Sequence, residues 1–355
     1  MTRLGARQSN TALVKNSFST VSQQRSRKAT TRMGIRQNTL VREGLSDYVV
    51  EVRPLIEQSL RAHLPLSLSG ANAHFNEALE YALFPGGKRI RPLLTLLGAE
   101  LVGGDRAHVL GAAIAVEFLH NSSLIFDDLP CMDDAATRRG RPALHRKYGE
   151  GVAILVAINL MNAAYGLVVG NAVRHTEGAS PACEELTECI GPNGMLGGQA
   201  IDLAARAGAL PQSSEEFLEE SRNRKTSALI RLSLRLGAIL VGAPPVRLVA
   251  LSQFAELLGN AYQLIDDLLD VEEDEPRRRV AQLAEHSAAG HVEDAATKVS
   301  ALLEQAKQVV VNEFGRTRHS ELLCEVADYV GRRQSRLVSP VYAESSSIPG
   351  DHRAA

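Results

Sequence analysis

Two clusters of aspartates, about 140 residues apart, are the residues of this chain best suited to chemistry. The first reads Asp127-Asp128-Leu-Pro-Cys-Met-Asp133, and the second reads Asp266-Asp267-Leu-Leu-Asp270. Several carboxylates within one or two turns repel one another unless a cation compensates their charge. Oxygen ligands of this kind suit Mg²⁺, which is commonly held by a few carboxylates together with substrate phosphates. Two facing clusters would therefore bind one diphosphate, whereas either cluster alone is also typical of a solvated acidic helix end.

The two clusters differ in how the chain must place their carboxylates. Asp266 and Asp270 are four residues apart, so one face of a helix carries both. Asp127 and Asp133 are six residues apart, which an ideal helix would put on different faces. Because Pro130 lies between them and disturbs a helix, we expect an irregular loop that returns Asp133 to the side of Asp127.

Basic residues in three segments complement these carboxylates. Lys88 and Arg91 follow a flexible glycine pair in GGKRIRP (86–92), and Arg138-Arg139-Gly140 follows the first cluster directly. Lys225 stands in a stretch with helical periodicity. Arginine suits forked contacts with phosphate oxygens, and lysine acts as a point charge. Any one of these residues alone is commonly a surface cation, and the glycine pair lacks the spacing of a P-loop.

The elements that must position these residues have a helical pattern from residue 44 to about residue 341. Apolar runs cover residues 109–126, 151–174, 215–242, 247–271 and 292–314, separated by Gly and Pro. No alternating β-branched run is long enough for a sheet. Helices that are apolar over most of their circumference lie centrally. We predict an all-α fold, a large single-domain helical bundle whose active residues point into a central cavity.

Composition limits the remaining possibilities. The chain has 355 residues, 45% of them apolar, and a formal net charge of −2. It can bury a large core, and its balanced charge gives no reason to expect a nucleic-acid partner. The four cysteines lack metal-site spacing. The most apolar stretch, residues 153–169, contains Asn159 and Asn162, so we expect a buried helix and no transmembrane segment.

The two ends of the chain differ from its body. Residues 1–42 contain nine Lys and Arg but no Asp or Glu, and Glu43 is the first acid. A basic, Ser/Thr-rich, acid-free extension over residues 1–43 is typical of an organellar transit peptide, and a disordered basic tail or a misplaced start codon are the alternatives. A transit peptide would direct the protein to a plastid or mitochondrion; without one, the cytoplasm is expected. Residues 44–342 form the predicted domain, and residues 343–355 a flexible tail.

Over residues 75–272 the chain resembles the trans-isoprenyl diphosphate synthases, especially the geranylgeranyl type. The matching segments are GGKRIRP (86–92), Glu117-x-x-His120, SLIFDDLPCMDD (123–134), RRGRPALH (138–145), Gly149-Glu150, GGQAIDL (197–203), KTSAL (225–229) and YQLIDDLLD (262–270). The resemblance implies a Mg²⁺-dependent prenyltransferase that condenses isopentenyl diphosphate with dimethylallyl, geranyl or farnesyl diphosphate. The expected product is geranylgeranyl diphosphate, and the expected assembly is a homodimer, with a heteromer containing another synthase subunit left open.

The resemblance also assigns roles to individual residues. Mg²⁺ and the allylic diphosphate would be bound by Asp127, Asp128, Asp133, Asp266, Asp267 and Asp270. The diphosphate of isopentenyl diphosphate would be held by Lys88, Arg91, His120 and Arg139, and the allylic diphosphate would be touched by Arg138 and Lys225. The reacting centre would be lined by Thr226, Gln199, Gln263 and Asp202. Ser122 and Ser123 would flank the growing chain, where an aromatic side chain would stop its growth early.

The chain departs from the family pattern at three places. Ile158 stands where the family carries Asp, and Ser221-Arg-Asn-Arg224 stands where His often precedes Lys-Thr. After Asp270 the family's lysine-bearing loop is missing, and residues 271–279 are VEEDEPRRR instead. The arginines at 277–279 would either replace the lost lysines or begin a solvated helix. The missing loop keeps open a second function, a weakly active or non-catalytic partner subunit that modulates a synthase. A terpene cyclase would show an Asn-Asp-x-x-Ser-x-x-x-Glu motif, which is absent.

Overall fold

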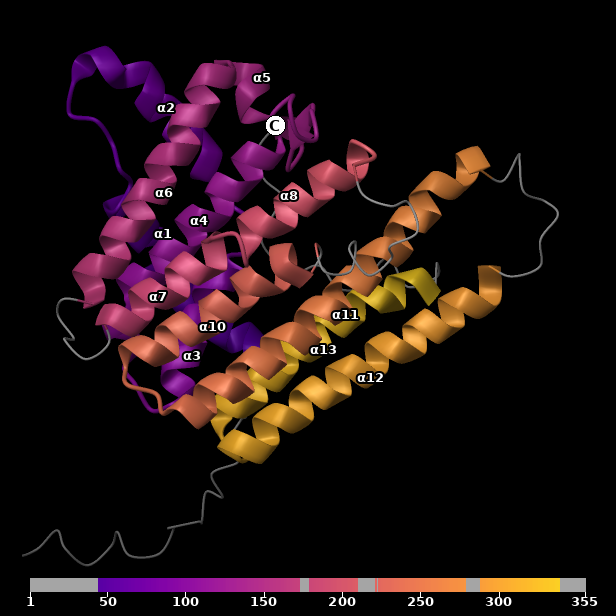
Figure 1. The fold of residues 1–355 in the computed structure, drawn as a ribbon. Helices are drawn as coiled ribbons and strands as arrows, with labels where there is room; N and C mark the ends of the chain where they lie inside the picture. Colours follow the sequence, from indigo (N-terminus) through magenta and orange to yellow (C-terminus); the bar gives the residue numbers. More distant parts are fainter. Residues whose placement is uncertain (1–43, 173–178, 210–220, 222, 279–287, 339–355) are drawn as a thin grey trace, which may run out of the picture. The chain divides into compact units, whose positions relative to one another are not determined.

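The computed structural model describes residues 44–172, 179–209, 221, 223–278 and 288–338 (Figure 1). These residues belong to one unit of the chain, Glu43–Ala355. The predicted extension (1–43) and tail (343–355) lie outside the described residues. The described part is helical apart from one hairpin of two-residue strands, which confirms the all-α prediction.

The elements follow one another in a simple order. The long helices are α1 (Leu45–Ala62), α2 (Ala73–Leu83), α3 (Ile90–Leu101), α4 (Leu110–Asp127), α6 (Glu150–Ala172), α7 (Ala179–Ile190), α8 (Met195–Arg206), α10 (Ala228–Leu240), α11 (Pro245–Arg278), α12 (Ala288–Phe314) and α13 (Arg318–Val338). The short elements are the 3₁₀ turns Gly70–Asn72 and Arg106–Val109, β1 (Thr137–Arg138), β2 (Arg141–Pro142), α5 (Leu144–Tyr148) and the π-helical turn Asn223–Ser227.

Helix α4 lies at the centre of the bundle, packed against α6, α3, α10 and α1 (Figure 1). Its residues from 112 to 119 are all buried, whichever way they point. A helix apolar around its whole circumference can be stable in water only when other helices surround it. The long apolar run that ends at the first aspartate cluster is therefore the core helix that the sequence predicts.

Helices α3 and α10 approach so closely that their backbones meet. A Cβ atom at Gly98 would lie 2.2 Å from the carbonyl oxygen of Leu234, and one at Gly237 would lie 2.0 Å from the carbonyl oxygen of Thr95. Only glycine, which has no Cβ, fits at these two positions. The segments that carry Lys88 and Lys225 directly precede α3 and α10, so this contact helps to fix two groups of basic residues.

Helix α11 is continuous through the second aspartate cluster and ends at Arg278. The sequence predicts that the family's lysine-bearing loop is missing after Asp270, and the backbone there continues as helix. Arg277 and Arg278 end α11, which corrects the expectation that they begin a new helix. The side chains of Asp267 and Asp270 lie outside the described part of the structure.

Two helical segments, Arg106–Asp127 and Glu150–Asn171, are long and apolar enough to cross a membrane by length and composition. In an 18-residue apolar window of the first segment 67% of the residues are buried inside the protein, and in that of the second 33% are. The first contains the core helix α4. The second leaves a row of apolar side chains exposed on α6, namely Ile154, Leu155, Ile158 and Val169.

The α3–α10 contact makes a prediction about stability. Replacing Gly98 with alanine should lower the free energy of unfolding by about 1–3 kcal/mol, because the new methyl group collides with a backbone that cannot move aside. Gly111→Ala is the matched control, since its Cβ would have only one neighbour, the Asn171 Oδ1 at 3.8 Å. Urea denaturation of both variants measures the difference. Equal stabilities would show that α3 and α10 can separate without cost.

Candidate active site

The first aspartate cluster lies where α4 ends. The helix stops at Asp127, three residues before Pro130, because proline disfavours helix at and before its own position. The chain then folds back, and the backbone N–H of Asp133 donates to the carbonyl oxygen of Asp127 at 3.0 Å. The N–H of Ala135 donates to the carbonyl oxygen of Asp128 at 3.2 Å. The predicted return of Asp133 to Asp127 is thus confirmed.

Two carboxylates of this cluster each face a cation from another element. The ammonium group of Lys225, in the π-helical turn, lies 3.3 Å from Asp127 Oδ1. Nε of Arg138, in β1, donates to Asp128 Oδ1 at 3.0 Å. Asp128 is only 3% exposed, so an unpaired charge there would be strongly destabilising. Burial raises the pKa of the Asp127 carboxyl group, and the nearby Lys225 opposes that rise.

The third carboxylate, Asp133, is held by a residue that the sequence did not point to. Arg206, the last residue of α8, donates to Asp133 Oδ1 at 2.7 Å. Its other terminal nitrogen donates to Asp202 Oδ2 at 2.9 Å, one turn back on the same helix. The predicted residue Gln199 also lies on α8, where its Nε2 is 3.6 Å from the sulfur of Met132. Helix α8 therefore contacts the loop of the first cluster at two points.

A second group of basic side chains has few acids near it. Nη1 of Arg91 donates to Nε2 of His120 at 3.2 Å, which requires a neutral imidazole. Burial, followed by the charges of Arg91 and Arg139, holds the pKa of His120 well below its usual value. A Cβ at Gly87 would lie 3.3 Å from the Arg139 guanidinium, so the GGKRIRP and RRG segments meet here. Like charges held together in this way favour the binding of an anion.

The β1–β2 hairpin presents Arg139 at its tip. The strands pair Arg138 with Arg141 and leave Arg139-Gly140 as the two-residue turn. Both turn residues have positive φ, 54° and 73°, as a type I′ turn requires. Arginine is an unusual residue for that conformation. Strain of this kind is commonly kept at functional positions, in agreement with the predicted role of Arg139.

Arg89 is a second residue that the sequence interpretation missed. Its guanidinium is buried and donates to Glu57 Oε1 at 2.8 Å, to Glu117 Oε1 at 2.6 Å and to the carbonyl oxygen of Leu83 at 2.8 Å. It adopts φ 56° immediately before α3. These contacts anchor the chain between Lys88 and Arg91. A buried acid in an apolar helix, Glu117, was the available signal that a buried cation must accompany it.

Lys88 takes a different direction from Arg91. It is exposed, and its ammonium group donates to the hydroxyl of Tyr329 on α13 and lies 5.2 Å from the centre of that ring. The C-terminal helix thus contributes a side chain next to a predicted substrate-binding lysine. The structure does not pair Lys88 with Arg91, His120 and Arg139.

The second aspartate cluster is described in part. Gln263 and Asp266 are partly buried on α11, whereas the side chains of Thr226, Asp267 and Asp270 lie outside the described part. Helix α11 packs against the π-helical turn at Gly259, where a Cβ would lie 2.1 Å from Ser227 Oγ. The helix of the second cluster therefore runs beside the segment that carries Lys225.

Ser122 and Ser123 face the helices around them. Ser122 is fully buried, and its hydroxyl donates to the carbonyl oxygen of Ala157 on α6 at 2.9 Å. Ser123 is partly buried and donates to the carbonyl oxygen of His120 at 2.9 Å. Ser122 thus lies at the contact between α4 and α6, and any larger side chain there must displace α6.

The site's donors fit Mg²⁺ by their chemistry. Asp127, Asp128 and Asp133 offer carboxylate oxygens, the ligands that hard divalent cations prefer. Each carboxylate already attracts a positive charge, and the return of the loop brings Asp133 to Asp127. Among the described side chains no group of three or more His, Cys, Asp or Glu has the arrangement of a complete metal site. Additional ligands would have to come from the second cluster or from a substrate.

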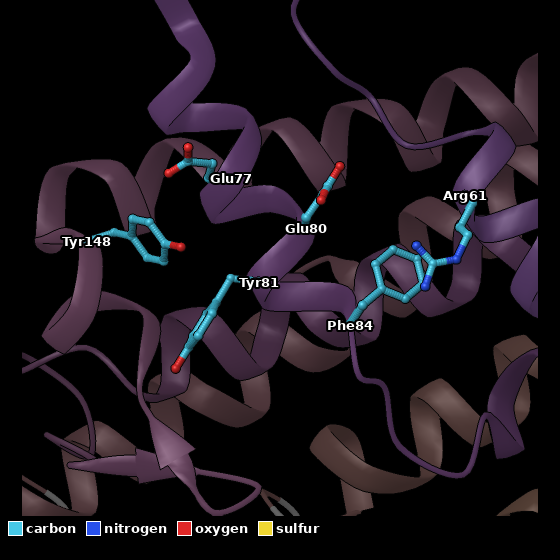
Figure 2. Close-up of a pocket in the computed structure, with 6 residues that line it drawn as sticks. All are labelled: Arg61, Glu77, Glu80, Tyr81, Phe84 and Tyr148. Carbon is cyan, nitrogen blue, oxygen red and sulfur yellow. The ribbon is translucent and has the colours of Figure 1, made fainter. Parts of the chain in front are cut away.

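A pocket of about 350 Å³ lies outside this site, between α1, α2 and α5 (Figure 2). The Arg61 guanidinium lies over the Phe84 ring at 4.2 Å from its centre, and Tyr81 and Tyr148 meet edge to face. Glu77 and Glu80 complete its lining. None of the predicted site residues lines this pocket, so the aspartate clusters remain the candidate site.

Comparison with known proteins decides the family. The sequence profile of the polyprenyl synthetase family matches residues 72–279, more than half of the chain. The chain belongs to the polyprenyl synthetase family. It is 39% identical over 228 residues to geranylgeranyl pyrophosphate synthase 11 of Arabidopsis thaliana, covering 64% of this chain and 63% of that protein.

Two further comparisons agree with this family. The chain is 37% identical over 229 residues to heterodimeric geranylgeranyl pyrophosphate synthase large subunit 1 of the same plant, covering 63% of this chain and 60% of that protein. The matches to these two plant proteins span less than two thirds of their lengths. The crystal structure of an FPP/GFPP synthase from Zymomonas mobilis superposes with a TM-score of 0.70 at 30% identity, covering 81% of this chain and 98% of that chain.

The basic group around His120 makes a prediction about pH. The depressed pKa means that folding favours the neutral imidazole, so this contribution to stability is complete above the unfolded pKa of about 6.5 and declines as the pH falls below it. Arg139→Gln should raise the pKa of His120, because it removes one of the repelling charges. Titration of the imidazole C–H signals by NMR measures the shift. Arg146→Gln, which alters an exposed arginine paired with Asp134, is the control. An unchanged His120 pKa in Arg139→Gln would show that the charge of Arg139 does not act on His120.

Proposed function

We propose that this protein is a Mg²⁺-dependent prenyltransferase that joins isopentenyl diphosphate to an allylic diphosphate. One observation carries the proposal: three neighbouring carboxylates are each paired with a basic side chain from a different element. The cationic group of Arg91, His120 and Arg139 supports a second anion site. The family membership and the relatives' names support the same reaction class. The proposed product is geranylgeranyl diphosphate.

The allylic diphosphate would bind at the first cluster. Lys225 and Arg138 would donate to its phosphate oxygens. Mg²⁺, held by Asp127, Asp133 and Asp266 with help from Asp128, Asp267 and Asp270, would supply charge neutralisation at the leaving diphosphate. As the carbon–oxygen bond breaks, both electrons leave with the diphosphate. Preorganised positive charge at the point where negative charge develops is the main source of the rate enhancement.

Isopentenyl diphosphate would bind at the second group of cations. Arg91, His120, Arg139 and Lys88 would hold its diphosphate, with neutral His120 acting as a hydrogen-bonding side chain. Its alkene would attack the allylic cation and form the new carbon–carbon bond. The departing diphosphate would accept the proton that is then lost, so no protein nucleophile is needed. Gln199, Gln263, Asp202 and Thr226 would line the reacting centre, where exclusion of water protects the cation.

The exposed apolar side of α6 supports a homodimer. Leu155 is 58% exposed and Ile158 is 50% exposed, three residues apart and thus on one face. Ile158 replaces the Asp that the family pattern leads one to expect, which makes this face more apolar. A second copy of the chain would cover it through its own α6. Leu155→Asp should shift the mass in analytical ultracentrifugation from dimer to monomer, and a monomeric wild type would contradict the assignment.

The alternative of a partner subunit rests on the missing loop. Helix α11 continues to Arg278 where the family's lysines would otherwise stand, and one relative is named as a subunit of a heterodimeric synthase. A protein active only after addition of a separate synthase would favour this alternative.

The location is proposed to be a plastid, supported by the chloroplastic relatives and the basic residues 1–43. Expression of residues 1–43 fused to a fluorescent protein tests that location.

The main prediction concerns turnover. Purified protein should convert isopentenyl and farnesyl diphosphates only when Mg²⁺ is present. Asp127→Asn or Asp266→Asn should lower kcat by at least about a hundredfold, because each removes a ligand of the Mg²⁺ that stabilises the developing negative charge. Product formation from labelled isopentenyl diphosphate measures the rate. Asp134→Asn, in the same loop but outside the proposed ligands, should stay within about threefold of wild type. Normal turnover in Asp127→Asn would contradict the proposed site.

A second prediction concerns product length. Ser122→Phe should shorten the main product from twenty carbons towards fifteen, because a ring at the α4–α6 contact would narrow the path along α4. Chromatography of the dephosphorylated products measures their lengths. Ser59→Phe, on α1 away from this contact, is the control for general loss of packing. An unchanged product distribution in a folded Ser122→Phe variant would show that another wall sets the length.

A further inference from the structure

Among the described residues, Arg206 is a basic partner of the first cluster that neither the family pattern of the sequence nor the reaction above assigns. It bridges two carboxylates, Asp133 at 2.7 Å and Asp202 at 2.9 Å. Asp133 belongs to the proposed metal-binding loop, and Asp202 belongs to the same helix as Arg206. The bridge therefore joins α8 to the loop that would bind the allylic diphosphate.

The two carboxylate contacts of Arg206 are of different kinds, and its Nη1 also donates to the carbonyl oxygen of Met132 at 3.5 Å. Asp202 is four residues earlier on α8, so that contact is maintained by the helix itself. Asp133 lies 73 positions away in the sequence, on a loop outside any helix, and that contact depends on where the loop lies. When Asp133 turns towards a metal ion, Arg206 keeps its attachment to Asp202. The nitrogen that donates to Asp133 would then keep only its long contact with the carbonyl oxygen of Met132, close to the cluster.

Accessibility separates Arg206 from the structural arginine nearby. The Arg206 side chain is 49% exposed, whereas that of Arg89, locked between Glu57 and Glu117, is 1% exposed. A guanidinium group that is half exposed can exchange a carboxylate partner at little cost, because ion pairs at this exposure are weak. Its planar fork suits the oxygens of a phosphate group as well as those of a carboxylate.

We propose that Arg206 is a third cation of the allylic diphosphate site, beside Lys225 and Arg138, and that it passes from Asp133 to a phosphate oxygen when substrate binds. This inference rests on the proposed function. It also accounts for charge: α11 continues as helix where a lysine-bearing loop is missing, and Arg206 supplies a cation at the first cluster from α8. The ligand class is a diphosphate bound together with a divalent cation.

Binding of inorganic diphosphate in the presence of Mg²⁺ tests the proposal without any turnover. Isothermal titration calorimetry would compare wild type, Arg206→Gln, Arg206→Lys and the control Arg146→Gln. The control is closely matched. Nη2 of Arg146, on α5, lies 2.6 Å from Oδ1 of Asp134, which follows Asp133 in the loop, and the Arg146 side chain is 47% exposed. Circular dichroism confirms that each variant is folded.

The proposal predicts that Arg206→Gln weakens diphosphate binding about tenfold, since it removes one charge-assisted hydrogen bond. Arg206→Lys should recover part of that loss, and Arg146→Gln should stay within about twofold of wild type. Equal affinity in Arg206→Gln and wild type would overturn the inference and leave the proposed function intact. A wild type that binds no diphosphate would overturn both. Tighter binding of Mn²⁺ alone to Arg206→Gln, with unchanged diphosphate affinity, would make Arg206 a competitor of the metal and would also overturn the inference.

Discussion

The structure of this site depends on the pairing of three carboxylates with three cations that arrive from different parts of the chain. Asp128 is almost completely buried, and a buried carboxylate without a partner would cost several kcal/mol. The hairpin, the π-helical turn and the end of α8 must therefore all reach the end of α4 for the charges to be compensated. The same pairs would also prepare the site for its substrate, because a phosphate group can replace a carboxylate as the partner of each cation.

The second anion site follows a different electrostatic rule. Arg91, His120 and Arg139 repel one another, and the structure lowers that repulsion by keeping His120 neutral. Glu117 donates no charge to these side chains through a direct bond, because its carboxylate accepts a hydrogen bond from the buried Arg89. Arg89 and Arg139 both have positive φ, a conformation that costs free energy for any residue other than glycine. The backbone conformations of Arg89 and Arg139 therefore lower the stability of the fold in the two segments that carry the cationic side chains.

Much of this arrangement could be predicted from the sequence, because it depends on local rules. Helical periodicity located α4, α6 and α12 to within a few residues, and Pro130 predicted the loop that returns Asp133 to Asp127. Arg206 could not be predicted, since its pairing with Asp133 depends on how α8 packs against a loop 73 positions away. Nor could the length of α11: Pro276 favours a helix end, yet the backbone remains helical to Arg278.

A crystal structure with Mn²⁺ and an unreactive allylic thio-diphosphate would test most directly whether the first cluster is a metal-dependent diphosphate site. Anomalous scattering locates the manganese without reference to the protein chain. The account predicts manganese bound to Asp127 and Asp133, with phosphate oxygens within hydrogen-bonding distance of Lys225 and Arg138. Manganese bound elsewhere, or an analogue that binds while Lys225–Asp127 and Arg138–Asp128 remain paired and make no contact with it, would contradict the account.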